Sequence, residues 1–126
     1  MSLGRLLVTT PSRSIDYEVV SPTVNVGRSP DGNQLVLDGT FSLTFYFRTT
    51  FSRRRRHHAD AEVSRWHCRF EFGKKGICRV VDLQSANGTN LNEKSVVSEE
   101  GAVVSNSDVI YVRIFQSAFI LTFLLQ

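Results

Sequence analysis

The chain has 126 residues, of which 41% are hydrophobic and 21% charged, and its formal net charge is +3. This length suits one domain, and the composition excludes a wholly disordered chain. The sequence contains neither the run of about 18 apolar residues that a transmembrane helix needs nor a signal-peptide pattern, so it predicts a soluble, intracellular protein.

Short strands separated by turn signals are predicted along most of the chain. Apolar or alternating runs lie, in chain order, at residues 6–8, 17–20, 24–26, 35–37, 68–72, 77–81, 109–112 and 119–124. In the 68–72 run, apolar and polar side chains alternate with the period of two that is typical of a strand, and no segment keeps a helical period over three turns. The pattern predicts an all-β fold, a β-sandwich of two antiparallel sheets with about 10–11 short strands.

Residues 39–62 interrupt this rhythm, and we expect them to form an insertion in a loop. Its aromatic part, residues 41–47, alternates loosely and is predicted as an extra strand. The segment then reaches four consecutive arginines, Arg53–Arg56, followed by His57 and His58. Such a run is typical of a solvated loop, and it also fits a nuclear localisation signal or a contact with nucleic acid, since aromatic residues lie close by.

The chain has two cysteines, Cys68 and Cys78, which are too far apart in sequence to form a Cys-x-x-Cys zinc motif. A disulfide across a hairpin is an alternative, but two buried thiols are expected in an intracellular protein. We therefore predict no metal site and no cofactor.

Three short motifs, each at a junction of strand and loop, carry the side chains suited to holding a phosphate. Gly27-Arg28 ends one strand, and a guanidinium matches phosphate oxygens through its planar fork of donors. Ser64-Arg65-Trp66-His67 opens another strand and supplies a hydroxyl and a second guanidinium.

The third motif is Asn87-Gly88-Thr89, at the end of the run Asp-Leu-Gln-Ser-Ala-Asn-Gly-Thr that begins at Asp82. Asn-Gly is a strong turn signal because both residues tolerate positive φ. The amide of Asn87 can donate to and accept from a passing peptide backbone, whatever the peptide's side chains are. Thr89 is expected to form a hydrogen bond within the turn.

In this order the three motifs resemble those of the forkhead-associated (FHA) domain, a β-sandwich module that recognises phosphothreonine. The resemblance rests on Gly27-Arg28, on Ser64 and His67, and on Asn87-Gly88-Thr89, and it covers about residues 4–125 apart from the insertion. It implies a single FHA domain over residues 1–126, which we expect to be the N-terminal part of a larger protein.

The resemblance also implies roles for individual residues. Arg28, Ser64 and Arg65 would contact the phosphate, and Asn87 with Ala86 would contact the peptide backbone. The residues that would hold the loops in place are Gly27, His67, Gly88 and Thr89. Family members prefer phosphothreonine over phosphoserine because the threonine methyl group fills a small apolar pocket.

Two departures from the family pattern affect these roles. Ala86 stands where many members carry a polar side chain, which removes a hydrogen bond to the ligand worth about 1 kcal/mol. Arg28 and Ser64 lie 36 positions apart, more than is usual in the family, because the 39–62 insertion separates them. The insertion is predicted either to extend the peptide site or to cover it.

The function predicted from the sequence is therefore phosphorylation-dependent recruitment of a phosphothreonine-containing protein, in a signalling, cell-division or DNA-damage context and in the nucleus. The alternatives are binding of nucleic acid through Arg53–Arg56 and protein–protein interaction without phosphate. Ser64, His67 and Asp82 have the side-chain types of a hydrolase, but the sequence has no nucleophile elbow and no oxyanion-hole motif, so no enzyme is predicted. No membrane and no small-molecule substrate are expected as partners.

Overall fold

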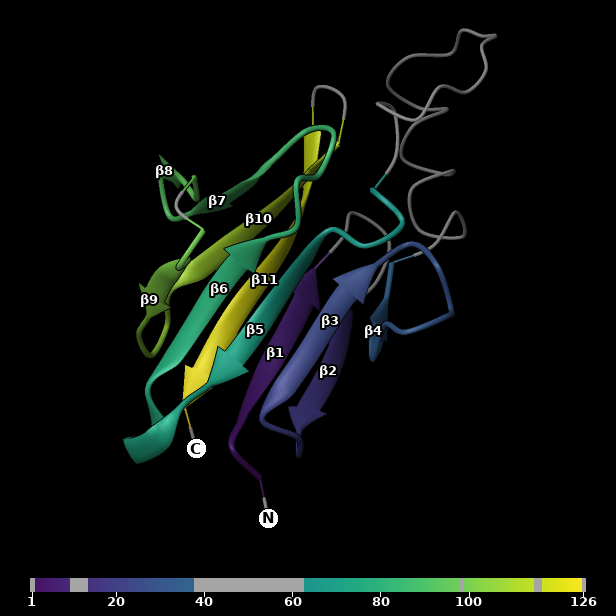
Figure 1. Ribbon diagram of the computed structural model, residues 1–126. Coiled ribbons are helices and arrows are strands. Elements are labelled where there is room, and N and C mark those ends of the chain that lie inside the picture. Colours follow the sequence, from purple (N-terminus) through teal and green to yellow (C-terminus); the bar gives the residue numbers. More distant parts are fainter. Residues whose placement is uncertain (1, 10–13, 38–62, 98, 115–116, 126) are drawn as a thin grey trace, which may run out of the picture.

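The computed structural model describes residues 2–9, 14–37, 63–97, 99–114 and 117–125. The predicted insertion at 39–62, with its aromatic strand and the Arg53–Arg56 run, lies outside these residues. In the described part of the chain, two sheets pack face to face (Figure 1). The predicted β-sandwich is therefore confirmed.

The larger sheet has six strands in the order β2-β1-β11-β10-β7-β8, and its described neighbours pair in antiparallel fashion. Its strands are β1 (Gly4–Thr9), β2 (Ser14–Val19), β7 (Thr89–Leu91), β8 (Lys94–Ser95), β10 (Val109–Ile114) and β11 (Ser117–Leu125).

The smaller sheet has five strands in the order β4-β3-β5-β6-β9. Its strands are β3 (Thr23–Gly27), β4 (Leu35–Val36), β5 (Cys68–Phe72), β6 (Cys78–Asp82) and β9 (Ala102–Val104). Strand β3 pairs with β4 in parallel, while the other pairs are antiparallel. A 3₁₀ turn, η2 (Lys74–Gly76), closes the β5–β6 hairpin, between the predicted strands at 68–72 and 77–81.

Alternating side chains of both sheets meet in one core between them. In β1, Leu6 and Val8 are fully buried while Arg5 and Thr9 are exposed, and in β5 Cys68 and Phe70 point inward. This is the pattern expected when one face of each sheet is covered and the other meets water. Cys68 and Cys78 are free and buried, as predicted, and form no disulfide. Burial raises the pKa of the Cys78 thiol to about 12.

The topology gathers the three sequence motifs at one end of the sandwich. Strand β3 ends there at Gly27, β5 begins there after His67, and β6 leads there into the loop before β7, whereas both termini lie at the opposite end (Figure 1). Among the described residues, no helix has the length and apolar character needed to cross a membrane.

Candidate functional site

Backbone hydrogen bonds join the loop after β3 to the segment before β5. The Arg28 N–H donates to the Ser64 carbonyl at 3.0 Å, and the Ser29 N–H donates to the Arg65 carbonyl at 3.2 Å. The Arg28 side chain adds a third link, because its Nε donates to the Val63 carbonyl at 3.0 Å. Residues 36 positions apart in sequence are thus held side by side, with Arg28 and Ser64 on adjoining segments.

Gly27 makes this close approach possible. A Cβ atom at this position would lie 2.2 Å from the Arg65 carbonyl oxygen and 2.8 Å from Nδ2 of Asn33. The same amide of Asn33 donates to the carbonyls of Ser29 and Arg65, each at 2.8 Å, and the residue is nearly buried. Asn33 is therefore a structural residue of the site that the sequence presents only as part of a turn.

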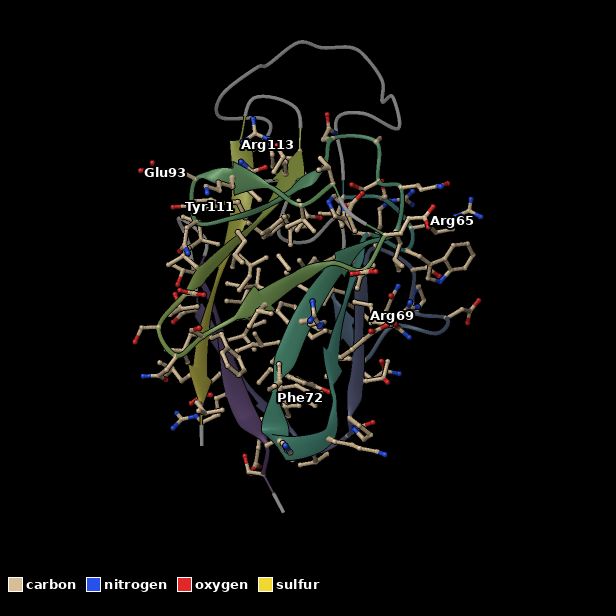
Figure 2. All side chains as sticks on the ribbon, turned by 60° about the vertical axis from the view of Figure 1, so that its left-hand side comes forward. Arg65, Arg69, Phe72, Glu93, Tyr111 and Arg113 are labelled. Atoms are coloured by element: carbon tan, nitrogen blue, oxygen red, sulfur yellow. The ribbon has the colours of Figure 1, made fainter. Side chains whose placement is uncertain are left out.

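Arg65 and Trp66 form the outer wall of this part of the site. The guanidinium carbon of Arg65 lies 5.8 Å from the centre of the Trp66 ring, within the range of a cation–π contact. The indole Nε1 of Trp66 donates to the Asp31 carbonyl at 2.9 Å, which ties the second motif to the tip of the first loop. Arg65 is exposed at the upper end of the molecule, far from Phe72 at the lower end (Figure 2).

Ser64 connects the second motif to the third. Its Oγ accepts the Ala86 N–H at 2.9 Å. A hydroxyl has one donor and two acceptor sites, so accepting this bond leaves the O–H group to donate elsewhere, including to a ligand oxygen. Because this bond occupies the backbone N–H of Ala86, the peptide contact predicted for Ala86 cannot use that N–H group while the bond is made.

His67 makes the second connection, from a fully buried position. Its Nδ1 accepts the Ser64 N–H at 3.2 Å, and its Nε2 lies 2.8 Å from the Gly88 carbonyl. Since Nδ1 must accept, the proton sits on Nε2 and donates to Gly88. Burial, which disfavours the charged imidazolium, lowers the pKa of His67 below 6.5, whereas the Gly88 hydrogen bond acts in the opposite direction.

We expect the lowered pKa of His67 to make stability depend on pH. Below pH 6.5 the unfolded chain protonates its histidine while the folded protein resists, so the free energy of unfolding falls as pH drops toward the folded-state pKa. The slope for one group is at most about 1.4 kcal/mol per pH unit. Urea unfolding between pH 7.5 and 5 should show this fall in the wild type and a weaker one in His67→Gln; identical pH profiles would contradict it.

Asp82 organises the loop that carries the third motif. One carboxylate oxygen accepts the hydroxyls of Ser85 and Thr89, both at 2.6 Å, and the other accepts the Ser85 N–H at 3.1 Å. The Ser85 Oγ in turn accepts the Gly88 N–H at 2.9 Å. These bonds shape the turn that presents Asn87.

The Asn87-Gly88 turn differs in detail from the two-residue hairpin turn that this dipeptide favours. Gly88 has a positive φ of 93°, but the other left-handed residue of the loop is Gln84, at 61°, and not Asn87. The reason is that the loop has six residues between β6 and β7 and is closed by Asp82 and Ser85 rather than by a tight turn. Asn87 is half-buried in this loop.

The hydrolase alternative fails on this geometry. His67 approaches the backbone N–H of Ser64 and not its hydroxyl, and its other nitrogen is engaged by Gly88. Asp82 is bonded to Ser85 and Thr89. A nucleophile, a base and an orienting carboxylate must be linked in sequence by hydrogen bonds, and these three residues are not. The described residues also hold no cluster of three or more His, Cys, Asp or Glu side chains placed to bind a metal ion.

Comparison with known proteins agrees with this architecture. A protein-family model described as the FHA domain matches residues 24–113. A search of curated proteins gave no match.

Several solved FHA structures share the fold. The N-terminal FHA domain of Rad53p from S. cerevisiae, solved with a phosphothreonine peptide, superposes with a TM-score of 0.71 at 17% identity, covering 98% of this chain and 94% of that one. The FHA domain of the CT664 protein of Chlamydia trachomatis has a TM-score of 0.69 at 17% identity and covers 99% of both chains. That of an Arabidopsis thaliana hypothetical protein has a TM-score of 0.63 at 24% identity, covering 99% and 88%.

Proposed function

Because the chain belongs to the FHA domain family, we propose that it is a phosphopeptide-binding module that recognises phosphothreonine in a partner protein. The observation that carries the proposal is the convergence of Arg28, Ser64 and Asn87 at one end of the sandwich. Hydrogen bonds through Ala86, His67 and Gly88 tie Ser64 to the loop that carries Asn87 before any ligand arrives. The bonds of Arg28 to the Ser64 and Val63 carbonyls hold Arg28 beside Ser64. A prearranged site avoids part of the ordering cost of binding.

In this proposal each polar group has a separate task. The Arg28 guanidinium and the Ser64 hydroxyl bind phosphate oxygens. The guanidinium of Arg65, which lies over the Trp66 ring, adds a second positive charge near the phosphate. Asn87 binds the peptide backbone next to the phosphothreonine. A phosphothreonine brings nearly two negative charges and three acceptor oxygens, so these contacts are charge-assisted.

The module acts by binding alone, with no catalytic step. Two or three charge-assisted hydrogen bonds of about 1.5–3 kcal/mol each, less the cost of ordering a flexible peptide, give a dissociation constant on the order of micromolar. The partner is a phosphorylated protein, and recruitment follows the activity of the kinase that phosphorylates it. A nuclear location remains part of this proposal, resting on the resemblance stated above.

The direct test is a titration of the purified protein with three peptides of one sequence, carrying phosphothreonine, phosphoserine or unmodified threonine. We expect micromolar binding of the first and no saturable binding of the third. The missing methyl group should weaken phosphoserine binding by roughly tenfold. Equal binding of the phosphorylated and unmodified peptides, by a folded sample, would overturn the proposal in favour of phosphate-independent interaction.

A further inference from the structure

The larger sheet ends on one side at β2, which has a single neighbour within the described part of the chain. Strand β2 pairs with β1 alone, through six consecutive residue pairs without a bulge. It lies on the side of the molecule away from β7 and β8 (Figure 1). The outer strand of a sheet turns the N–H and C=O groups of alternate residues away from its neighbour, so β2 presents a row of donors and acceptors that an added strand can use.

The other sheet edges are much shorter. Strands β4 and β8 have two residues each and β9 has three, whereas β2 has six, none of them proline or glycine. Very short edge strands, prolines and bulges are the means by which proteins prevent unwanted strand pairing. Among the four edges of the described sheets, β2 is therefore the one whose length matches an ordinary strand of a partner.

The inner face of β2 is incompletely covered. Ile15 and Tyr17 pack against the core but stay half-buried, whereas their partners on β1, Val8 and Leu6, are fully buried. The difference follows from position, because β1 has a strand on each side and β2 has one neighbour among the described strands. An added strand with apolar residues on this face would cover the exposed flanks of Ile15 and Tyr17.

The outer face of β2 is acidic. Asp16 and Glu18 are both exposed, and β1 supplies one guanidinium for the two: Arg5 lies opposite Glu18, and its Nε donates to Asp16 at 3.0 Å. Two carboxylates with one guanidinium leave an excess of negative charge. Pairing the β2 strands of two copies along their length would set acidic side chains opposite each other, and like charges in that position are destabilising. Charge complementarity therefore favours a basic partner strand.

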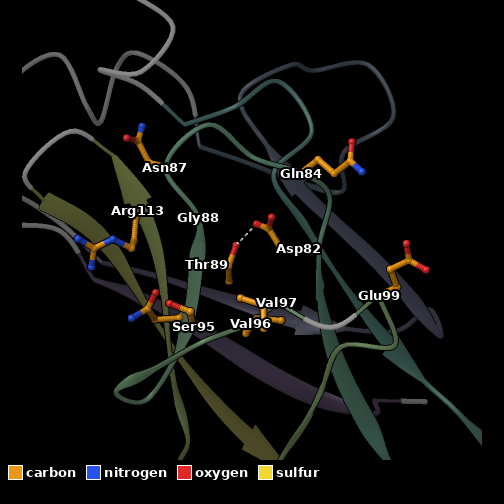
Figure 3. A pocket seen from close by; sticks show the side chains of 11 residues that line it. Asp82, Gln84, Asn87, Gly88, Thr89, Ser95, Val96, Val97, Glu99 and Arg113 are labelled. Atoms are coloured by element: carbon orange, nitrogen blue, oxygen red, sulfur yellow. Dashed lines mark hydrogen bonds between the residues drawn. The ribbon is translucent and has the colours of Figure 1, made fainter.

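This edge is separate from the phosphate site. Arg28, Ser64 and Asn87 lie in segments that join other strands. The groove of about 740 Å³ beside the Asn87 turn is lined by residues between positions 82 and 99 and by Arg113 (Figure 3). None of its lining residues belongs to β2. Phosphate binding and strand pairing at β2 thus use different residues.

We propose that β2 is a docking edge for an extended segment of a partner protein in which lysine or arginine alternates with apolar residues. The segment adds a further strand to the sheet through main-chain hydrogen bonds to β2. Its apolar side chains cover Ile15 and Tyr17, and its basic side chains face Asp16 and Glu18. No phosphate takes part, so this contact goes beyond phosphothreonine recognition and does not depend on a kinase.

The test is an NMR titration of the isotope-labelled protein with two unphosphorylated peptides of about eight residues, a length sufficient to span β2. In one peptide lysine alternates with valine, and in the other glutamate alternates with valine. We expect the lysine peptide to bind roughly two- to tenfold more tightly at low salt, since each cross-strand pair of opposite charges adds a small amount. Its binding should slow hydrogen exchange at alternate residues of β2, those whose N–H groups point away from β1.

Three variants assign the contact to the acidic edge. Glu18→Lys should weaken the preference for the lysine peptide, and adding Asp16→Lys should reverse it; both positions are exposed, so the fold should be retained. Glu93→Lys makes the same charge change at an exposed position between β7 and β8, toward the other edge of the sheet, and should keep the wild-type preference. Arg28→Ala should bind both peptides as the wild type does, because the phosphate site takes no part.

The outcomes decide this proposal separately from the proposed function. Equal affinity for the two peptides, no binding by the folded wild type, or protection at β9 instead of β2 would overturn it. A wild-type dimer whose outward β2 amides are already protected without peptide would also overturn it, because a second copy would then occupy the edge. A protein that binds the lysine peptide at β2 but no phosphothreonine peptide would sustain the docking edge and contradict the proposed function.

Discussion

Arg28→Ala should lower the affinity for a phosphothreonine peptide at least about 100-fold and leave the protein folded. The guanidinium is proposed to make two charge-assisted hydrogen bonds to the phosphate, each worth about 1.5–3 kcal/mol, so losing both costs about 3 kcal/mol or more. Fluorescence anisotropy with a labelled peptide measures this change.

The loss of stability in Arg28→Ala should be small for a structural reason. The Arg28 N–H keeps its bond to the Ser64 carbonyl, and the bond from Nε to the Val63 carbonyl is worth about 1 kcal/mol. A fall in melting temperature of a few degrees is expected, which is much less than the effect on binding.

Two comparison variants make the Arg28 result specific. Arg28→Lys keeps the positive charge but loses the planar fork, so it should bind with intermediate affinity. Arg79→Ala removes the same charge from an exposed strand position and should bind as the wild type does. If Arg28→Ala bound the peptide within about threefold of the wild type, the proposed phosphate contact of Arg28 would be wrong.

The sequence predicts the central strands of this fold because their side chains alternate. In β3 and β5 the inward residues are apolar and buried, and the period of two is visible without knowledge of the neighbours. Strand β10 is visible as an apolar run. The shorter strands carry no such signal. Lys94 and Ser95 of β8 are both exposed, and this strand exists because it pairs with β7. Strand β9 has three residues and depends on its pairing with β6.

The candidate site shows the same division between local and long-range information. The residue types in the three motifs indicate phosphate binding because guanidinium, hydroxyl and amide groups are the donors that a phosphopeptide needs. The bonds that assemble the site cross large sequence separations, such as that of Asn33 to Arg65, and no local pattern predicts them. The link from Asp82 to Ser85 is an exception, because an aspartate three residues before a serine is spaced for a local turn bond.

Gly27→Ala should destabilise the protein by about 3 kcal/mol, the upper part of the usual range for overpacking, and weaken peptide binding as well. The added methyl group would lie 2.2 Å from the Arg65 carbonyl oxygen, well below van der Waals contact. The clashing atom belongs to the backbone, so the strain can be relieved only by moving β3 away from the segment before β5. That movement stretches the hydrogen bonds from Arg28 to Ser64 and from Ser29 to Arg65, which hold the phosphate site together.

The free energy of unfolding of Gly27→Ala, measured in urea, is compared with that of Gly73→Ala. The second variant makes the same substitution at a position where the added methyl group has room. Gly73 has φ of −88°, and a Cβ there would come no closer than 3.8 Å to any neighbour, at the Ile77 carbonyl. Alanine at position 73 should leave stability within about 0.5 kcal/mol of the wild type, since exposed substitutions without a clash have small effects. If both variants unfolded at the wild-type midpoint and bound peptide normally, the close approach at Gly27 would not be what positions Arg28 beside Ser64. A large effect at Gly27 alone would show that the phosphate site depends on this one contact between two backbones.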